Sequence, residues 1–157
     1  MYLKRTKKIG TLFLIAAVLT FLLAGCTSKS ASYTFALATG EMMKVELDTM
    51  DGYSLKQEEG RFYVENDGKR LLGGAFITEE AFDEYVALQD EPHITVLENG
   101  EEDTFSYSMY EYNDGSVIEN NYLVWVFDAN VGILIGGTSD AEATKTAFEK
   151  LNFSLDE

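Results

Sequence analysis

The chain has 157 residues, of which 46% are hydrophobic and 13% aromatic, and its formal net charge at pH 7 is −15. This length predicts one compact domain with its own core and leaves no room for a two-lobed solute receptor. The acidity excludes nucleic acid as a partner, because no basic patch is available to neutralise phosphates. We expect the charge to serve mainly to keep the domain soluble.

The N-terminal segment combines a basic start with a short apolar run. Four cations lie within residues 4–8, and the 16 residues 9–24 that follow are almost entirely apolar. As a helix this run would be about 24 Å long, whereas the hydrocarbon core of a bilayer is about 30 Å thick. The pattern therefore indicates a cleaved export signal rather than a transmembrane helix.

The apolar run ends in Leu23-Ala24-Gly25-Cys26, which resembles the lipobox of bacterial lipoproteins. The resemblance implies cleavage between Gly25 and Cys26 and a diacylglyceryl group on the Cys26 thiol, detectable with palmitate. The lipid would be the only cofactor. The implied location is the outer face of the cell membrane, in the cell envelope of a bacterium of Gram-positive type.

Cleavage would remove residues 1–25, leave 132 residues and change the formal charge to −19. Cys26 is the only cysteine, so we expect neither disulfides nor a cysteine nucleophile in the folded part. Residues 26–32 are the lipidated cysteine and a short polar tether. Residues 33–157 form the single globular domain.

The first half of this domain shows the two-residue alternation of strands, interrupted by turn residues. Strands are expected at 43–47, 53–57, 61–65 and 71–77. Asn66-Asp67-Gly68-Lys69 predicts a tight hairpin, and Gly73-Gly74 indicates a bulge or close packing. Thr78 is expected to cap a helix. The apolar face of that helix contains Phe82, Tyr85 and Val86.

The second half predicts a run of antiparallel strands and a closing helix. Pro92 ends the first helix, and strands follow at 94–97, 104–112, 117–129 and 131–138, with turns at 99–100 and 113–115. Ser139 and Glu142 fit a capping box. The apolar face of the second helix is expected to contain Ala143, Ala147, Phe148 and Leu151. Phe153 and Leu155 then form a last short strand or a fastened tail.

The elements add up to an α+β fold, a twisted and mostly antiparallel meander with about two helices packed on it, preceded by the signal-peptide helix. The order of a Lys-Val-Glu-Leu strand, a hairpin, a helix near Glu79, a long meander and a closing helix resembles the PsbP-like and DcrB-like α-β-α sandwich domains. The resemblance spans residues 40–155. It implies a non-catalytic domain that docks onto other proteins.

The sequence offers little support for catalysis or for a metal site. His93 is the only histidine and is expected in a solvated loop, while Ser106 and Ser108 lack a nucleophile-elbow pattern. Asp48 and Asp51 lack the rest of a calcium loop. We therefore expect no catalytic residue and no metal, with a carboxylate-based hydrolase as the alternative.

Aromatic residues are unusually dense in the meander, where Phe105, Tyr107, Tyr110 and Tyr112 precede Tyr122 and Trp125. Apolar residues change phase at Met109, so Tyr110 and Tyr112 should face opposite to Phe105, and some tyrosines should be exposed. The interaction residues expected on this basis, together with an acidic hairpin tip that could meet a basic partner or a cation, are Tyr107, Tyr110, Tyr112, Trp125, Glu101, Glu102 and Asp103.

The predicted function is a membrane-anchored, non-catalytic module that binds another extracytoplasmic protein. The alternative is a lipoprotein that binds a small ligand or a cell-envelope glycan. The two differ in shape, because docking needs a flat apolar patch, whereas ligand binding needs a concave aromatic pocket.

Overall fold

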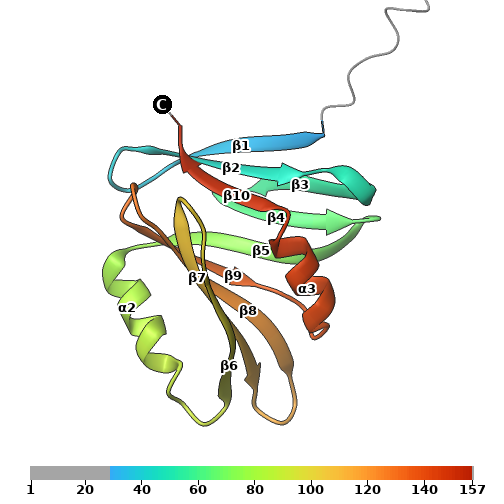
Figure 1. Ribbon diagram of the computed structural model, residues 1–157, viewed down its shortest axis with the longest axis vertical. Helices are drawn as coiled ribbons and strands as arrows, with labels where there is room; N and C mark the ends of the chain where they lie inside the picture. The colour runs from blue at the N-terminus through green and yellow to red at the C-terminus, as the bar shows by residue number, and fades with distance from the viewer. Residues whose placement is uncertain (1–28, 157) are drawn as a thin grey trace, which may run out of the picture.

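The computed structural model describes residues 29–156 and has the predicted α+β fold (Figure 1). The predicted signal segment and Cys26 lie outside the described residues. No helix within residues 29–156 is long and apolar enough to cross a membrane. The elements are β1 (Ser30–Ala36), β2 (Met42–Asp48), η1 (Met50–Gly52), β3 (Tyr53–Glu58), β4 (Arg61–Asn66), β5 (Lys69–Ile77), α2 (Glu79–Leu88), β6 (Ile94–Glu101), β7 (Phe105–Asn113), β8 (Ile118–Val126), β9 (Val131–Gly136), α3 (Ala141–Phe148) and β10 (Leu151–Leu155).

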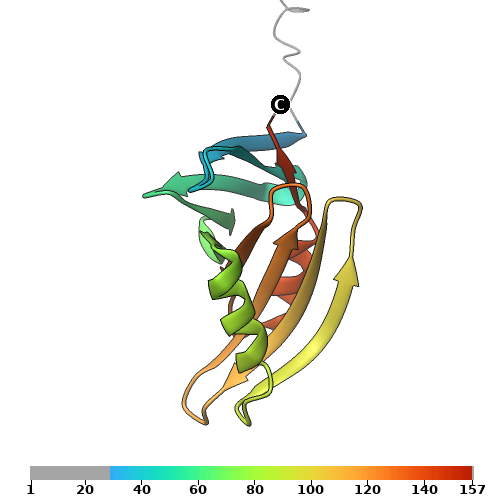
Figure 2. The same cartoon turned by 90° about the vertical axis from the view of Figure 1, so that its left-hand side faces the viewer.

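The described strands form two antiparallel sheets. A small sheet has the order β1-β2-β10, and a seven-stranded sheet has the order β3-β4-β5-β9-β8-β7-β6. The larger sheet consists of two meanders, β3-β4-β5 and β6-β7-β8-β9, which meet where β5 pairs with β9. Helix α2 connects them by crossing from β5 to the far edge strand β6 (Figures 1 and 2).

One face of the seven-stranded sheet, here called the inner face, forms the core. Phe62 of β4 contacts Phe35 of β1 and Phe153 of β10, with ring centroids 6.3 and 5.9 Å apart. Phe105 of β7 contacts Phe153 at 5.3 Å. Burial of these large rings joins the small sheet to the inner face. Because side chains alternate between the two faces along a strand, β2 contributes every second residue to this core.

The two helices cover opposite faces of the larger sheet. Phe148 of α3 stacks on Tyr122 of β8 with centroids 3.7 Å apart, which places α3 on the inner face. Phe82 of α2 contacts Trp125 at 4.9 Å, and Trp125 points to the opposite face, here called the outer face. No residue of α2 is fully buried. The outer face is therefore only lightly covered.

Most local predictions for the first half are confirmed. The Asp67-Gly68 turn has positive φ at both residues, 50° and 77°, as a two-residue hairpin requires. The side chain of Thr78 accepts a hydrogen bond from the backbone N–H of Ala81 and caps α2. Phe82 and Tyr85 face the sheet, but Val86 is 46% exposed, so the predicted apolar face of α2 is only partly correct.

The predicted turn at Asn99-Gly100 is wrong, because β6 continues through both residues to Glu101. Gly100 instead lies under the ring of Tyr107, where a Cβ atom would come within 2.3 Å of the ring. The chain turns later, where the N–H of Glu102 donates to the carbonyl of Phe105. Gly100 is therefore needed because it makes room for the Tyr107 ring within a strand, and not because it forms a turn.

Three boundaries also differ from the prediction. Residues 30–32 of the expected tether belong to β1, because they pair with residues 46–48 of β2. Asp140, rather than Ser139, caps α3, since its side chain accepts a hydrogen bond from the N–H of Ala143. Helix α3 ends at Phe148, so Leu151 belongs to β10, which confirms the last short strand.

Close packing at Gly74 generates a prediction for stability. A Cβ atom at Gly74 would lie 2.0 Å from the fully buried ring of Phe62, which cannot move away without displacing the core. We expect Gly74→Ala to lower the free energy of unfolding by about 1–3 kcal/mol. Urea denaturation measures this change.

Gly136→Ala is the matched control, because a Cβ atom there meets only ordinary contacts at 3.7 Å or more. We expect its free energy of unfolding to stay within about 0.5 kcal/mol of the parent. Equal stability of the two variants would contradict the proposed packing of Phe62 against Gly74.

Candidate functional site

A row of five paired residues crosses the outer face of the larger sheet. Tyr63 of β4 pairs with Gly73 of β5, Gly73 with Gly136 of β9, Gly136 with Asn121 of β8, and Asn121 with Tyr110 of β7. Paired residues point to the same face of an antiparallel sheet. Two tyrosines therefore stand on either side of a floor made of two glycines and an asparagine.

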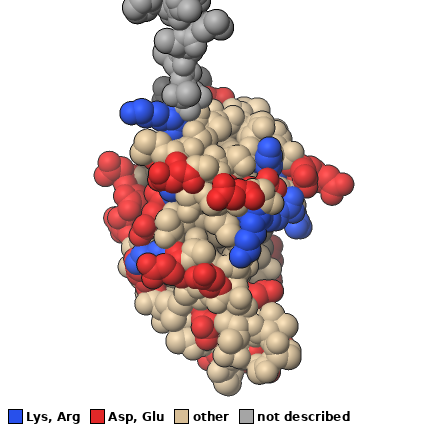
Figure 3. Space-filling model, turned by 90° about the vertical axis from the view of Figure 1, so that its right-hand side faces the viewer, with Lys and Arg blue, Asp and Glu red and all other residues tan. Residues whose placement is uncertain are grey.

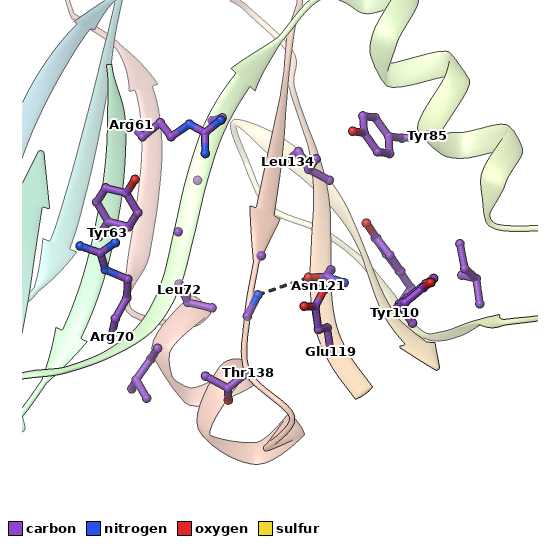
Figure 4. A pocket seen from close by; sticks show the side chains of 18 of the residues that line it. Arg61, Tyr63, Arg70, Leu72, Tyr85, Tyr110, Glu119, Asn121, Leu134 and Thr138 are labelled. Carbon is purple, nitrogen blue, oxygen red and sulfur yellow. Dashed lines mark hydrogen bonds between the residues drawn. The ribbon is translucent and has the colours of Figure 1, made fainter. Parts of the chain in front are cut away.

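This row lies in a cavity of about 740 Å³, here called the outer-face pocket. Figure 4 shows Arg61, Tyr63 and Arg70 on one side of it and Tyr85, Tyr110 and Glu119 on the other. The volume lies within the range of about 300–1,000 Å³ that is usual for small-molecule sites. The chemistry-bearing residues of its lining are Arg61, Tyr63, Arg70, Tyr85, His93, Tyr110, Tyr112, Glu119, Asn121 and Thr138.

The missing side chains of Gly73 and Gly136 make the pocket deep in its centre. The ring of Tyr63 leans over Gly73, since a Cβ atom there would lie 3.0 Å from two ring carbons. At Gly136 the nearest atoms would be Asn121 Oδ1 and the Gly73 carbonyl, at 3.7 and 3.9 Å. A Cβ atom at Gly136 would thus fit, and a longer side chain would extend into the pocket from its floor.

The two arginines of the pocket are held differently. The guanidinium of Arg70 lies 3.6 Å from the centroid of the Tyr63 ring, and its Nη2 lies 3.3 Å from Glu58 Oε2. Arg61 forms no ion pair within residues 29–156 and is exposed. Arg70 therefore fixes the Tyr63 ring, while the Arg61 cation remains available.

Tyr110 is the most buried aromatic residue of the pocket, with 8% of its surface exposed. Burial raises the pKa of its hydroxyl to about 12, and nearby Tyr85 and Glu119 contribute in the same direction. The hydroxyl consequently stays protonated at neutral pH and can donate a hydrogen bond to a bound molecule. It makes no hydrogen bond to another residue in the described part of the chain.

Asn121 presents a donor to the same space. Its Oδ1 accepts a hydrogen bond of 3.3 Å from the N–H of Gly137, drawn in Figure 4. This bond orients the amide so that its nitrogen is left to donate elsewhere. Tyr112 lies at the pocket edge, where His93 contacts its ring edge-on at 5.1 Å and Asp114 raises the pKa of its hydroxyl by its negative charge.

The structure divides the predicted aromatic interaction residues between the two faces. Tyr110 and Tyr112 point to the outer face, opposite to Phe105, as expected from the change of phase. Tyr107 points inward, where it contacts Phe148 and Tyr122 and donates a hydrogen bond of 3.1 Å to Glu98. Trp125 faces outward but lies against Phe82 of α2.

The expectation of exposed tyrosines among these residues is wrong. Tyr110 is buried, and Tyr107 and Tyr112 are half-buried. Helix α2 and the loop after it line the pocket with Tyr110 and Tyr112, whereas Tyr107 packs against Phe148 of α3 on the inner face. Strand alternation alone does not predict either covering. His93 is exposed, as expected for its loop, yet it also lines the pocket.

The acidic tip does not take part in the outer-face pocket. Glu101, Glu102 and Asp103 are exposed at the turn between β6 and β7, and two of them line a separate cavity of about 350 Å³ with Tyr107 and Phe148. Within residues 29–156 no three acidic, histidine or cysteine side chains are grouped so that they could hold a metal ion.

The sequence did not predict the side of the pocket formed by β4 and β5, which contributes Arg61, Tyr63 and Arg70. One signal for two of them was present, because Arg61 and Tyr63 alternate with Phe62 and Val64 and so must share the face opposite to the core. Nothing in the sequence indicated that β4 and β7, separated by three strands, would face each other across the same pocket.

Comparison with known proteins adds no relative: no protein-family model, no curated protein and no solved structure matches the chain. The class is therefore defined by fold and site, as an α+β domain with an aromatic pocket on one sheet face.

The raised pKa of Tyr110 predicts a change of stability with pH. The native protein holds this proton up to about pH 12, whereas an unfolded tyrosine loses it near pH 10, so the free energy of unfolding falls as pH rises through this interval. We expect Tyr110→Phe to make the fall shallower by on the order of 2 kcal/mol.

Urea denaturation at about pH 8, 10 and 11.5, which lie below, at the start of and within this interval, measures the effect. The two proteins should have the same slope below pH 9. Parallel pH profiles of parent and Tyr110→Phe over the whole range would mean that the hydroxyl of Tyr110 is not buried as described.

Proposed function

We propose that the chain is a membrane-anchored extracytoplasmic lipoprotein whose domain binds a small polar ligand or a cell-envelope glycan, without catalysis, in the outer-face pocket. The concave, aromatic shape of this pocket is the observation that carries the proposal. It favours ligand binding over the docking of a flat protein surface as the main function.

The composition of the pocket supports binding of a polar molecule with flat faces. Four tyrosines offer both ring faces and hydroxyl groups, and Asn121 and Thr138 add further hydrogen-bonding groups. Sugars have this mixed character, with apolar ring faces and polar edges, and tyrosine is suited to both. The glycine floor leaves room for a ring between the two aromatic sides.

The lining of the pocket favours binding over hydrolysis. Glu119 is the one carboxylate of the pocket lining, and a carboxylate-based hydrolase needs a pair on either side of the scissile bond. His93 lies at the pocket edge against Tyr112, and no serine lines the pocket beside it. A binding role uses every feature of the site, whereas hydrolysis uses few.

Filling the pocket floor tests the proposal. Gly136→Leu places a side chain between Tyr63 and Tyr110 at a position where an added Cβ atom meets only ordinary contacts. A digest of bacterial peptidoglycan at saturating concentration should raise the Tm of the parent by about 3 °C or more and leave that of Gly136→Leu unchanged.

Ser32→Leu is the matched control, because it adds the same side chain at an exposed position of β1. It should respond to the digest like the parent. A Tm shift that is equal in the parent and in Gly136→Leu would place binding outside the pocket, and no shift in any protein with this digest or with soluble glycans would reject glycan binding.

The anchor is tested separately from the pocket. Cells that express the full chain and are fed a tagged palmitate should label it, because the lipobox directs diacylglyceryl transfer to Cys26. Cys26→Ser should lose the label, because a serine hydroxyl cannot form the thioether bond that joins the diacylglyceryl group to the cysteine sulfur. Thr27→Ala should keep the label. Label that persists in Cys26→Ser would disprove lipidation at this position.

A second candidate function, docking of another extracytoplasmic protein, is favoured by the lower end of the molecule. On the face shown in Figure 3, most acidic groups lie over the upper part and few lie toward this end. Exposed apolar side chains come from α2, β6 and the β7–β8 turn, namely Val86, Leu88, Val96, Leu97, Val117 and Ile118. Such surfaces are common in protein interfaces.

A further inference from the structure

The ligand class can be narrowed by the charges at the outer-face pocket, an inference that rests on the proposed function. Beyond residue 28 the sequence contains only two arginines, Arg61 and Arg70, and both line this pocket. The chain as a whole has 27 acidic residues and a formal net charge of −15. Both arginines therefore lie at one site of this acidic protein, where Glu58 lies opposite Arg61 in the β3–β4 pairing and contacts Arg70.

The two arginines differ in their contacts, so they differ in how they could bind an anion. The guanidinium of Arg70 packs on the Tyr63 ring, which leans over Gly73, and is also paired with Glu58. Arg61 precedes Tyr63 by two residues on the same strand and points to the same face. Because it forms no ion pair within residues 29–156, its planar set of donors is free to bind a carboxylate with two hydrogen bonds.

The opposite side of the pocket is polar but carries no free cation. Tyr85, Tyr110 and Asn121 provide neutral groups there, and Glu119 provides a negative charge (Figure 4). An anionic group is therefore attracted to the Arg61 end and repelled from the Glu119 end. The pocket thus has a direction, and a molecule charged at one edge would bind in one orientation.

We propose that the outer-face pocket binds an acidic oligosaccharide, with a sugar ring over the glycine floor between Tyr63 and Tyr110 and the sugar carboxylate on Arg61. The hydroxyl of Tyr110 and the amide nitrogen of Asn121 donate to the ring hydroxyls. A carboxylate matches the planar guanidinium better than a point-like charge would, and sugar rings use the tyrosine faces that a small inorganic anion would leave unused.

Titration calorimetry on the full lipidated chain in detergent tests this assignment with two probes of equal length. A hyaluronan hexasaccharide carries glucuronic acid carboxylates, and a chitin hexasaccharide is neutral. The parent should bind the hyaluronan fragment about tenfold more tightly than the chitin fragment. Arg61→Gln should lower the affinity for the hyaluronan fragment about tenfold and so abolish its preference over the chitin fragment.

Lys44→Gln is the matched control, because it removes the same charge from β2, in the small sheet away from the pocket. It should bind both probes like the parent. Equal affinity for the two probes, unaffected by Arg61→Gln but lost in Gly136→Leu, would overturn the acidic ligand class and leave the proposed function standing.

A third probe separates the ligand classes. A short peptide with a free C-terminal carboxylate should not compete with the hyaluronan fragment. If the peptide binds in an Arg61-dependent manner and neither saccharide does, the ligand is a peptide and the saccharide assignment is wrong. If none of the three probes binds, the acidic-saccharide assignment is rejected together with glycan binding.

Discussion

The contact between Phe62 and its partners from the small sheet is the constraint on which the rest of the molecule depends. The ring of Phe62 lies over Gly74 and touches Phe35 and Phe153, so it joins β4 to β1 and β10 across the core. Because side chains alternate along a strand, burying Phe62 and Val64 forces Arg61 and Tyr63 to the other face. The core thereby determines one side of the pocket.

The outer face shows why the pocket remains open. Helix α2 lies along β8 and β9 and leaves the surface over β4 and β5 uncovered, and its own residues are at most half-buried. A glycine pair at the junction of the two meanders removes the side chains that would otherwise fill this space. Light coverage and absent side chains together produce a cavity on a sheet face that would otherwise be flat.

The acidic residues and the arginines of the domain are distributed differently over its surface. Most acidic groups within residues 29–156 lie at exposed positions, whereas both arginines of this range line one pocket. The raised pKa of Tyr110 has a different origin, since burial is its main cause. The site therefore combines a buried tyrosine, Tyr110, with an exposed cation, Arg61.

Features that depend on neighbouring residues could be predicted from the sequence more reliably than features that depend on distant strands. The α+β class, the Asp67-Gly68 hairpin, the Thr78 cap and the opposite directions of Phe105 and Tyr110 follow from short-range patterns, and they are confirmed. The turn at Gly100 and the cap at Ser139 are wrong, because a glycine under Tyr107 and an aspartate at the next position satisfy the same local patterns.

What the sequence determined by itself is therefore the type of each element and the face to which each side chain points, because periodicity and turn chemistry act over a few residues. Only the tertiary structure decided that Tyr63 and Tyr110 face each other, since this depends on β9 inserting between β5 and β8. The pairing of strands distant in the chain is set by the burial of the whole inner face, and no short stretch of residues encodes it.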